Sequence, residues 1–337
     1  MGIDSKREKA IFVTGATGSL GIPLVRELIR KGYDVRALVR NKKKRRLLPD
    51  EITCIIGELP SMGSIGSALN DVGCIVHLAA VVPGKETDDD YQDYYRVNVE
   101  GTINLAKAAL EAKVRRFIYV STIDVYGDSN LEEIDENSPL RPESIYALTK
   151  LQGERELLSV MRKADYGIEC VILRMSAVYG PNMKGNYPRM ARLLSKGFFP
   201  MIGNGRANKT LIFEKDAVKA IKLACESEEA VGKIFNVTDG NVHTICDIVE
   251  AICKALRKRP LIIKIPKQVA AHFAITVDGA LKFLGRPSMF MEYIKKFTGN
   301  ISVKGERFIN EIGFQPDFDL NRGWEETVGY WMEHGIV

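Results

Sequence analysis

Short apolar runs alternate with segments of helical periodicity along the first half of the chain. The runs predict buried strands, and between them apolar residues recur three and four positions apart, which predicts helices. This alternation favours an α/β fold, a doubly wound parallel sheet of Rossmann type with helices on both faces. The predicted strands are 10–14, 34–39, 52–56, 74–78, 114–120 and 168–173, and the predicted helices are 20–31, 61–71, 91–112 and 144–164.

The pattern changes after Arg174, where helical segments are separated by short extended pieces. This change predicts a smaller C-terminal lobe at the end of the sheet, so the chain is expected to divide into a Rossmann domain, 1–176, and a lobe, 177–337. The helices predicted in the lobe are 187–196, 215–227, 244–256, 266–284, 305–311 and 319–334, and the extended pieces are 200–202, 210–213 and 234–237.

Composition narrows the class of protein. The chain has 337 residues, of which 45% are hydrophobic and 27% charged, as is usual for a globular α/β protein. The formal net charge of +5 fits a small anionic ligand and is too modest to indicate nucleic-acid binding. The polar start, Met1 to Lys9, predicts no signal peptide, and the apolar stretch 261–284 contains too many charges and prolines to span a bilayer. A cytoplasmic protein is therefore expected.

Cysteine and histidine spacing predicts no metal site. The cysteines lie inside predicted strands and helices without a CxxC pair, which indicates buried free thiols, and the histidines lack ligand spacing. The cysteines are Cys54, Cys74, Cys170, Cys225, Cys246 and Cys253, and the histidines are His77, His243, His272 and His334.

The stretch Ala10 to Gly21 carries the first candidate chemistry. An apolar strand is followed by glycines at 15, 18 and 21 and then by a helical pattern. Strand, glycine turn and helix is the arrangement that places a dinucleotide pyrophosphate on a helix N-terminus, although any strand-to-helix turn could look similar. The predicted cofactor contacts of this turn are Gly15, Thr17, Gly18, Ser19, Leu20 and Gly21.

The end of the second strand bears on the choice of cofactor. An acid at this point selects NAD by accepting the ribose 2′-hydroxyl, whereas this chain has Arg40, followed by a basic run to Arg46. A guanidinium would pair with a 2′-phosphate, so NADP is predicted as first choice and NAD as second; a solvated basic turn is the alternative.

Further cofactor contacts are expected at the ends of the third and fourth strands. Glu58 and Leu59 follow the third strand, where an acid could reach the adenine amine or simply cap the next helix. Small residues after the fourth strand would let the backbone approach a ribose, with sheet packing as the alternative. The contacts predicted there are Leu78, Ala79 and Ala80.

Tyr146, Lys150 and Thr122 form the candidate catalytic set. Tyr146 and Lys150 are four residues apart and share a helix face, and Thr122 ends the fifth strand. A nearby ammonium is expected to lower the pKa of the phenol from its ordinary value of about 10, and the threonine hydroxyl could bond a substrate oxygen. A YxxxK pair alone is more often a surface feature; its position after the glycine turn gives it weight.

These motifs together resemble the extended short-chain dehydrogenase/reductase family, in its nucleotide-sugar epimerase and reductase branch. The matches follow the family's order through the first half and continue more weakly to the C-terminus. They are TGATGSLG at 14–21, HLAA at 77–80, NVEGTINL at 98–105, VSTIDVYG at 120–127, YALTK at 146–150 and LRMSAVYGPN at 173–182, then KGNYPRM at 184–190, 202–221, 235–240 and 313–331.

The resemblance implies further roles. Asn98 matches an asparagine that steadies the catalytic lysine through water, and Asn186 and Lys209 match positions that contact the diphosphate of the substrate, with Lys209 standing where the family has arginine. Asp124 is also expected to contact the substrate. The resemblance implies a homodimer through the helices 91–112 and 144–164.

The implied reaction is 4-epimerisation or 4-ketoreduction of a UDP- or related nucleotide-linked hexose, in surface polysaccharide biosynthesis. Dehydratases of the family carry Asp-Glu after the catalytic threonine, and this chain has Ile123 and Asp124, which disfavours dehydration. Two alternatives stay open: an NADPH-dependent reductase of a hydrophobic ketone, of the steroid or dihydroflavonol type, and a non-catalytic NADP-binding regulator.

Overall fold

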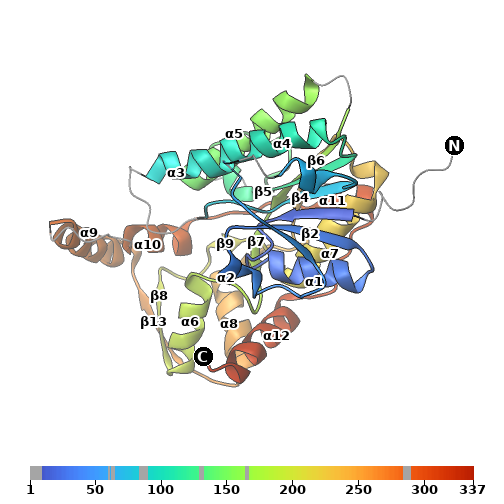
Figure 1. The fold of residues 1–337 in the computed structure, drawn as a ribbon. Helices are drawn as coiled ribbons and strands as arrows, with labels where there is room; N and C mark the ends of the chain where they lie inside the picture. Colours follow the sequence, from blue (N-terminus) through green and yellow to red (C-terminus); the bar gives the residue numbers. More distant parts are fainter. Residues whose placement is uncertain are drawn as a thin grey trace.

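A seven-stranded parallel sheet forms the centre of the computed structural model, which describes residues 10–59, 61, 65–82, 90–128, 133–163, 167–283 and 290–337 (Figure 1). The strand order is β11-β6-β5-β4-β1-β2-β3, so the order reverses between β1 and β4. In such sheets ligands bind outside the carboxyl ends of the strands at this reversal. The strands are β1 (Ala10–Thr14), β2 (Asp34–Val39), β3 (Thr53–Ile56), β4 (Cys74–His77), β5 (Arg116–Thr122), β6 (Glu169–Met175) and β11 (Ile234–Val237).

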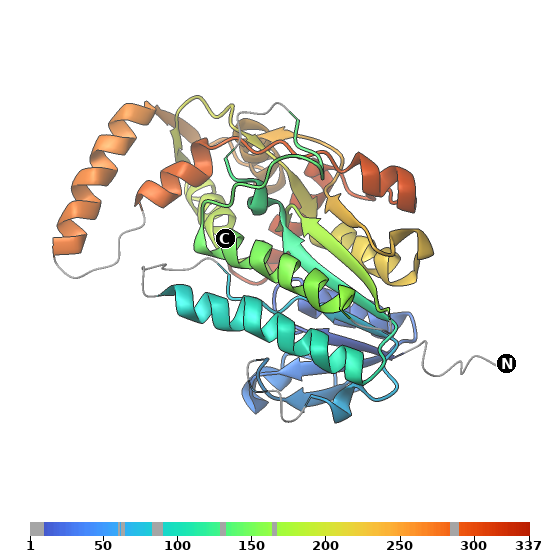
Figure 2. The ribbon, with the colours of Figure 1, turned by 90° about the horizontal axis from the view of Figure 1, so that it is seen from above.

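Helices cover both faces of this sheet (Figure 2). Both layers are needed because the central strands are buried on both sides; every residue of β1 and β4 is buried. On one face lie α1 (Gly21–Arg30), α7 (Glu214–Glu226) and α11 (Glu306–Ile312), and on the other α4 (Gly101–Glu111) and α5 (Ile145–Arg162). The predicted fold class is therefore confirmed.

Several predicted elements differ in detail. The helix expected at 61–71 contributes a single 3-10 turn, Ser67–Leu69, among the described residues. The helix expected at 91–112 consists of α3 (Tyr91–Tyr95), a π-helical turn at Arg96–Glu100 and α4. The basic run forms a short helix, α2 (Lys42–Arg45), whose N-cap Asn41 accepts a hydrogen bond from Lys44 N at 3.0 Å.

The second lobe packs around two tryptophans. Trp324 and Trp331 of α12 (Leu320–Glu333) are buried, and Trp324 stacks on Tyr179 with 4.7 Å between ring centroids. Short strand pairs surround this core, namely β7 (Ala177–Tyr179) with β10 (Leu211–Phe213), β9 (Asn208–Lys209) with β12 (His243–Thr244), and β8 (Phe198–Ile202) with β13 (Leu261–Ile265). Its other helices are α6 (Asn186–Ser195), α8 (Ile245–Leu256), α9 (Lys267–Phe283) and α10 (Phe290–Thr298).

The second half of the chain is not confined to the smaller lobe. The piece 234–237, expected in that lobe, is β11 and pairs with β6 at the edge of the main sheet. Its neighbours α7 and α11 also pack on the sheet. The apolar pattern of a strand indicates that the strand is buried, but it does not indicate which sheet the strand joins. The pairing of β11 with β6 could therefore not be predicted from the sequence.

The cysteines are free thiols, but they are less buried than predicted. All six cysteines are free, but only Cys74 and Cys170 are buried and the others are half-buried, against the expectation that all are buried. In the described segments, no group of three or more His, Cys, Asp or Glu side chains could hold a metal ion. Among the helices of these segments, none combines the length and apolar character that crossing a bilayer requires.

Candidate active site

The glycine turn between β1 and α1 leaves room for a dinucleotide backbone. Gly15 has φ +69° and lies so close to the fourth strand that a Cβ there would be 2.7 Å from the Ala79 nitrogen. The Gly18 N–H donates to the Gly15 carbonyl at 2.8 Å, and a Cβ on Gly21 would collide with the same carbonyl. Thr17 is half-buried and Ser19 exposed in the same turn.

The N-terminus of α1 suits an anion. Its N-cap, Leu20, provides no side-chain hydrogen bond, and the first turn has no acidic residue. The first N–H groups of the helix therefore have no side-chain cap and no carboxylate competing for the same position, and the helix dipole favours negative charge there. These observations fit the pyrophosphate of a nicotinamide dinucleotide.

The residues predicted to hold the adenosine end lie along the carboxyl edge of the sheet. Arg40 is exposed at the end of β2, directly before α2, and Glu58 is exposed after β3. The side chain of Leu59 is buried against α4 at Gly101, so it packs the sheet edge and leaves only its backbone for a ligand.

Asn98 fixes the segment that follows β4. Its amide accepts from Val81 N at 2.8 Å and donates to Val81 O at 3.2 Å and to the Thr149 hydroxyl at 3.0 Å. The π-helical turn containing Asn98 thereby ties the segment after Leu78, Ala79 and Ala80 to α5, at the residue before Lys150.

Thr122 and Tyr146 meet at the carboxyl end of β5. The Thr122 hydroxyl accepts a hydrogen bond from Asp124 N at 3.2 Å and lies near enough to the Tyr146 phenol to affect its pKa. Burial and the Asp124 carboxylate raise the pKa of Tyr146, and the Thr122 hydroxyl partly offsets this rise. The expected lowering of this pKa by Lys150 is wrong for this structure, and Tyr146 is a neutral phenol at pH 7.

The position of Lys150 explains that difference. The Lys150 Nζ lies 3.9 Å from the centroid of the Tyr119 ring. Burial lowers the pKa of His77, and the nearby charge of Lys150 lowers it further. Burial lowers the pKa of Lys150 to about 7, opposed by Glu154 one turn further along α5. Near neutral pH, Lys150 therefore has both its charged and its neutral form.

A buried ionic network beneath the site was not predicted. Glu154 pairs with Arg174 of β6 at 2.8 Å and accepts from the hydroxyl of Ser121, the neighbour of Thr122. Arg174 also donates to the Tyr126 hydroxyl at 2.9 Å, which donates to the Asn236 amide oxygen at 2.8 Å. The spacing of Lys150 and Glu154 was a local signal for one member of this network, but pairing across 20 residues needs the fold.

The predicted substrate contacts come from different elements. Lys209 of β9 donates to the Gly299 carbonyl at 2.7 Å, and burial lowers its pKa to about 8, opposed by Asp128 and Asp124. The Asp124 carboxylate therefore affects the pKa of both Lys209 and Tyr146. Asn186 is half-buried and begins α6 in the second lobe.

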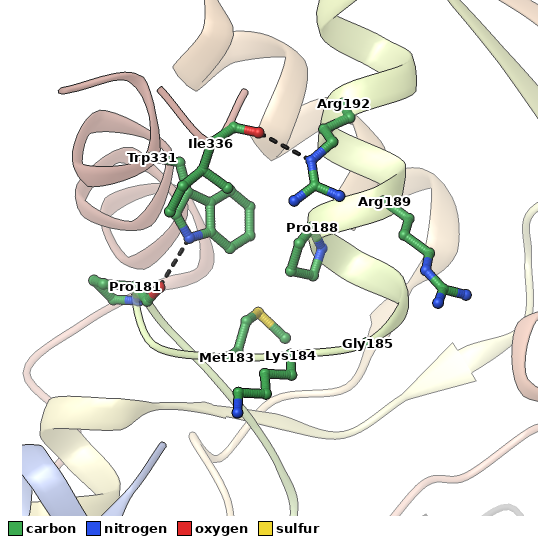
Figure 3. Close-up of a pocket in the computed structure, with 9 residues that line it drawn as sticks. All are labelled: Pro181, Met183, Lys184, Gly185, Pro188, Arg189, Arg192, Trp331 and Ile336. Carbon is green, nitrogen blue, oxygen red and sulfur yellow. Dashed lines mark hydrogen bonds between the residues drawn. The ribbon is translucent and has the colours of Figure 1, made fainter. Parts of the chain in front are cut away.

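A separate cavity of about 330 Å³ lies between α6 and α12 (Figure 3). Trp331 and Pro188 line it, and the Trp331 indole donates to the Pro181 carbonyl at 2.9 Å. Figure 3 shows Lys184 and Arg189 pointing away from one another, so the cations of this cavity do not converge on one point. The cavity contains none of the predicted site residues.

Solved structures share this fold over nearly the whole chain. A UDP-glucose 4-epimerase from Thermotoga maritima, solved with UDP-glucose, has a TM-score of 0.80 and 20% identity, covering 96% of this chain and 99% of that one. A UDP-glucuronic acid 4-epimerase from Bacillus cereus, solved with UDP-glucuronic acid and NAD, has a TM-score of 0.78 and 21% identity over the same shares.

Sequence comparison gives the family. A UDP-glucose 4-epimerase of Vibrio cholerae is 28% identical over 339 residues, covering 98% of each chain. Residues 11–238 match the family described as NAD dependent epimerase/dehydratase. The predicted resemblance and the predicted enzyme class, an NAD(P)-dependent enzyme of the extended short-chain dehydrogenase type, are therefore confirmed, and the chain belongs to the NAD dependent epimerase/dehydratase family.

Proposed function

We propose that this chain interconverts UDP-linked hexoses by 4-epimerisation. The observation that carries the proposal is the proximity of Thr122 and Tyr146, with Lys150 on the next turn of α5, at the carboxyl end of β5. Similarity to a UDP-glucose 4-epimerase along the full length supports the choice of substrate. A role in surface polysaccharide synthesis is part of the same proposal.

In this proposal, Tyr146 moves the proton and Thr122 orients the reacting oxygen. A bound nicotinamide supplies the acceptance and return of a hydride at C4. Tyr146 Oη takes the proton from the C4 hydroxyl during oxidation and gives it back to the C4 carbonyl during reduction. The phenol is neutral in this structure, whereas oxidation needs the phenolate, so Tyr146 must lose its own proton before the first step. A charged Lys150 would lower the energy of the phenolate, because opposite charges favour the ionised form.

The remaining predicted contacts divide between the two ligands. Cofactor contacts come from residues 1–176: the turn from Gly15 to Gly21, the sheet edge and Asn98. Substrate contacts come from Asp124, Asn186 and Lys209, two of which belong to 177–337. Lys209 would exchange its bond to the Gly299 carbonyl for a bond to a substrate phosphate, whose negative charge would favour the ammonium form of the lysine.

A second candidate reaction is the reduction of a 4-keto sugar. Arg40 favours it, because an exposed guanidinium at the end of β2 suits the 2′-phosphate of NADPH, the pool from which reductases draw. Incubation with UDP-glucose, UDP-N-acetylglucosamine and UDP-4-keto sugars, followed by NMR of the products, distinguishes the candidates. Epimerised sugar without net cofactor consumption is the expected result; consumption of NADPH would favour reduction, and turnover of a steroid or flavonoid ketone alone would contradict both.

Replacing Arg40 with alanine tests the cofactor proposal. If Arg40 holds a 2′-phosphate, the variant loses about tenfold in affinity for NADP and keeps its affinity for NAD, since a charge-assisted pair is worth about 1.5–3 kcal/mol. Titration calorimetry with both cofactors measures the change. The matched control is Arg36→Ala, a residue of the same strand whose guanidinium bonds the carbonyls of Ala68 and Asn70. Equal affinities of the unchanged protein for NAD and NADP would contradict the assignment.

The predicted homodimer is part of the proposal as well. Within the predicted segments 91–112 and 144–164, α4 and α5 lie side by side on one face of the sheet (Figure 2). Leu148 of α5 is 37% exposed. A sedimentation mass of one 37.6 kDa chain at micromolar concentration would contradict the dimer.

A further inference from the structure

An exposed apolar surface lies on the second lobe, at the end of the molecule formed by β13 and α9. Figures 1 and 2 show α9 projecting beyond the rest of the lobe, with α10 between it and the body. We call this surface the β13–α9 patch. It consists of Phe198, Leu261, Ile263, Val269, Phe273 and Ile275, which are 44%, 65%, 47%, 57%, 62% and 61% exposed.

The strand part of the patch follows from alternation. Phe199 and Met201 of β8 are buried in the lobe core, so Phe198 points to the opposite face, where it pairs with Leu261 of β13. Ile263 and Ile265 lie on the same face as Leu261. Ile265 is covered by α9 and α10, whereas Leu261 and Ile263 remain in solvent. One face of the two-stranded sheet therefore packs on the lobe core, and the apolar side chains of the other face are covered only in part.

The helix part of the patch is an exposed face of α9. Ala270 and Ala274 pack against Ile294 of α10, which fixes the buried side of the helix. Val269 and Phe273 are four residues apart and project from another side, with Ile275 at the far edge of the same exposed arc. The other exposed residues of this arc are Gln268, His272, Thr276 and Gly279, so the arc has no acidic residue.

Basic residues surround the patch. Between Ala251 and Val277 the sequence has six lysines and arginines and no aspartate or glutamate. Among them, Lys258 and Arg259 precede β13 and Lys267 begins α9, whereas Lys264 lies on the opposite face of β13 from Leu261 and Ile263. Large apolar side chains rimmed by cations are the combination that binds an anionic lipid surface, because the apolar groups enter the acyl boundary while the cations contact the head groups.

We propose that the β13–α9 patch docks this enzyme onto an anionic lipid bilayer surface. Charge argues against a second copy as the occupant, because a symmetric contact would bring the same cations of two chains together. The proposal is independent of the sugar reaction, since it uses none of the catalytic residues.

Flotation with lipid vesicles tests this proposal. The full-length protein is expected to float with vesicles of phosphatidylcholine and phosphatidylglycerol, to bind pure phosphatidylcholine far less, and to be released as salt rises. Phe273→Asp is expected to lower the partition coefficient at least about tenfold, because it removes a large apolar group and adds a repelled charge. The matched control is Met332→Asp, a residue of α12 that is 53% exposed and outside the patch.

The outcomes separate the possible occupants. Circular dichroism establishes that both variants are folded, and the double variant Val269→Ser with Ile275→Ser repeats the test without adding charge. Equal flotation of Phe273→Asp and Met332→Asp would overturn the proposal. Failure of the unchanged protein to float would overturn it in favour of an acidic protein partner. A lower sedimentation mass for Phe273→Asp, with unchanged flotation, would overturn it in favour of a contact between copies.

Discussion

Replacing Tyr146 with phenylalanine is expected to lower kcat for UDP-hexose epimerisation about a thousandfold, within the usual contribution of a positioned acid or base. The variant keeps the ring and removes only the oxygen that moves the proton and lies beside the Thr122 hydroxyl. Affinity for the cofactor is expected to change less than about threefold, because the predicted pyrophosphate contacts lie in the turn from Gly15 to Gly21. Single-turnover kinetics and titration calorimetry measure the two quantities separately.

The matched control for this experiment is Tyr33→Phe. The Tyr33 hydroxyl donates to Glu226 at the end of α7, beside the amino end of β2, so the same chemical change there is expected to leave kcat within about twofold. If Tyr146→Phe kept more than a tenth of the activity, another group would be moving the proton. The assignment would then be wrong even though the family is correct.

The first part of the candidate site could be predicted because its signals are local. A strand, a glycine turn and a helix occupy 21 consecutive positions, and the steric limit at Gly21 follows from neighbours within that stretch. Tyr146 and Lys150 share a helix face through spacing alone. The alternation of strand and helix patterns likewise predicted the parallel sheet.

The electrostatics of the site could not be predicted, because they depend on residues far apart in the sequence. Lys150 lies over Tyr119, and burial and the Asp124 carboxylate act on Tyr146, so the pKa of the phenol rises where spacing alone indicated a fall. The fold of the second half was also harder to predict. Apolar and polar residues do not alternate from Leu261 to Ile265, so the strand β13 was not predicted. The strand β11 joins the main sheet, although it follows several elements of the second lobe in the sequence.

Replacing Arg174 with methionine is expected to lower the free energy of unfolding by about 3–5 kcal/mol, the usual cost of breaking a buried ion pair. Glu154 would keep its charge in the core with Ser121 as its remaining hydrogen-bond partner from this network, and Tyr126 would lose a donor. Urea unfolding followed by circular dichroism measures the change. The matched control is Lys215→Met, which breaks the exposed pair with Glu326 and is expected to cost less than about 1 kcal/mol.

A double variant then distinguishes the cost of an unpaired charge from the value of the pair itself. Glu154→Leu combined with Arg174→Met removes both charges, and the cost of unpaired burial disappears with them, so most of the lost stability is expected to return. Activity is not expected to return in full, because Glu154 also raises the pKa of Lys150. The double variant should therefore have less charged Lys150 near pH 7 and reach its full rate only at lower pH. If it matched the unchanged protein in both stability and pH profile, the network would have no role beyond filling space under the site.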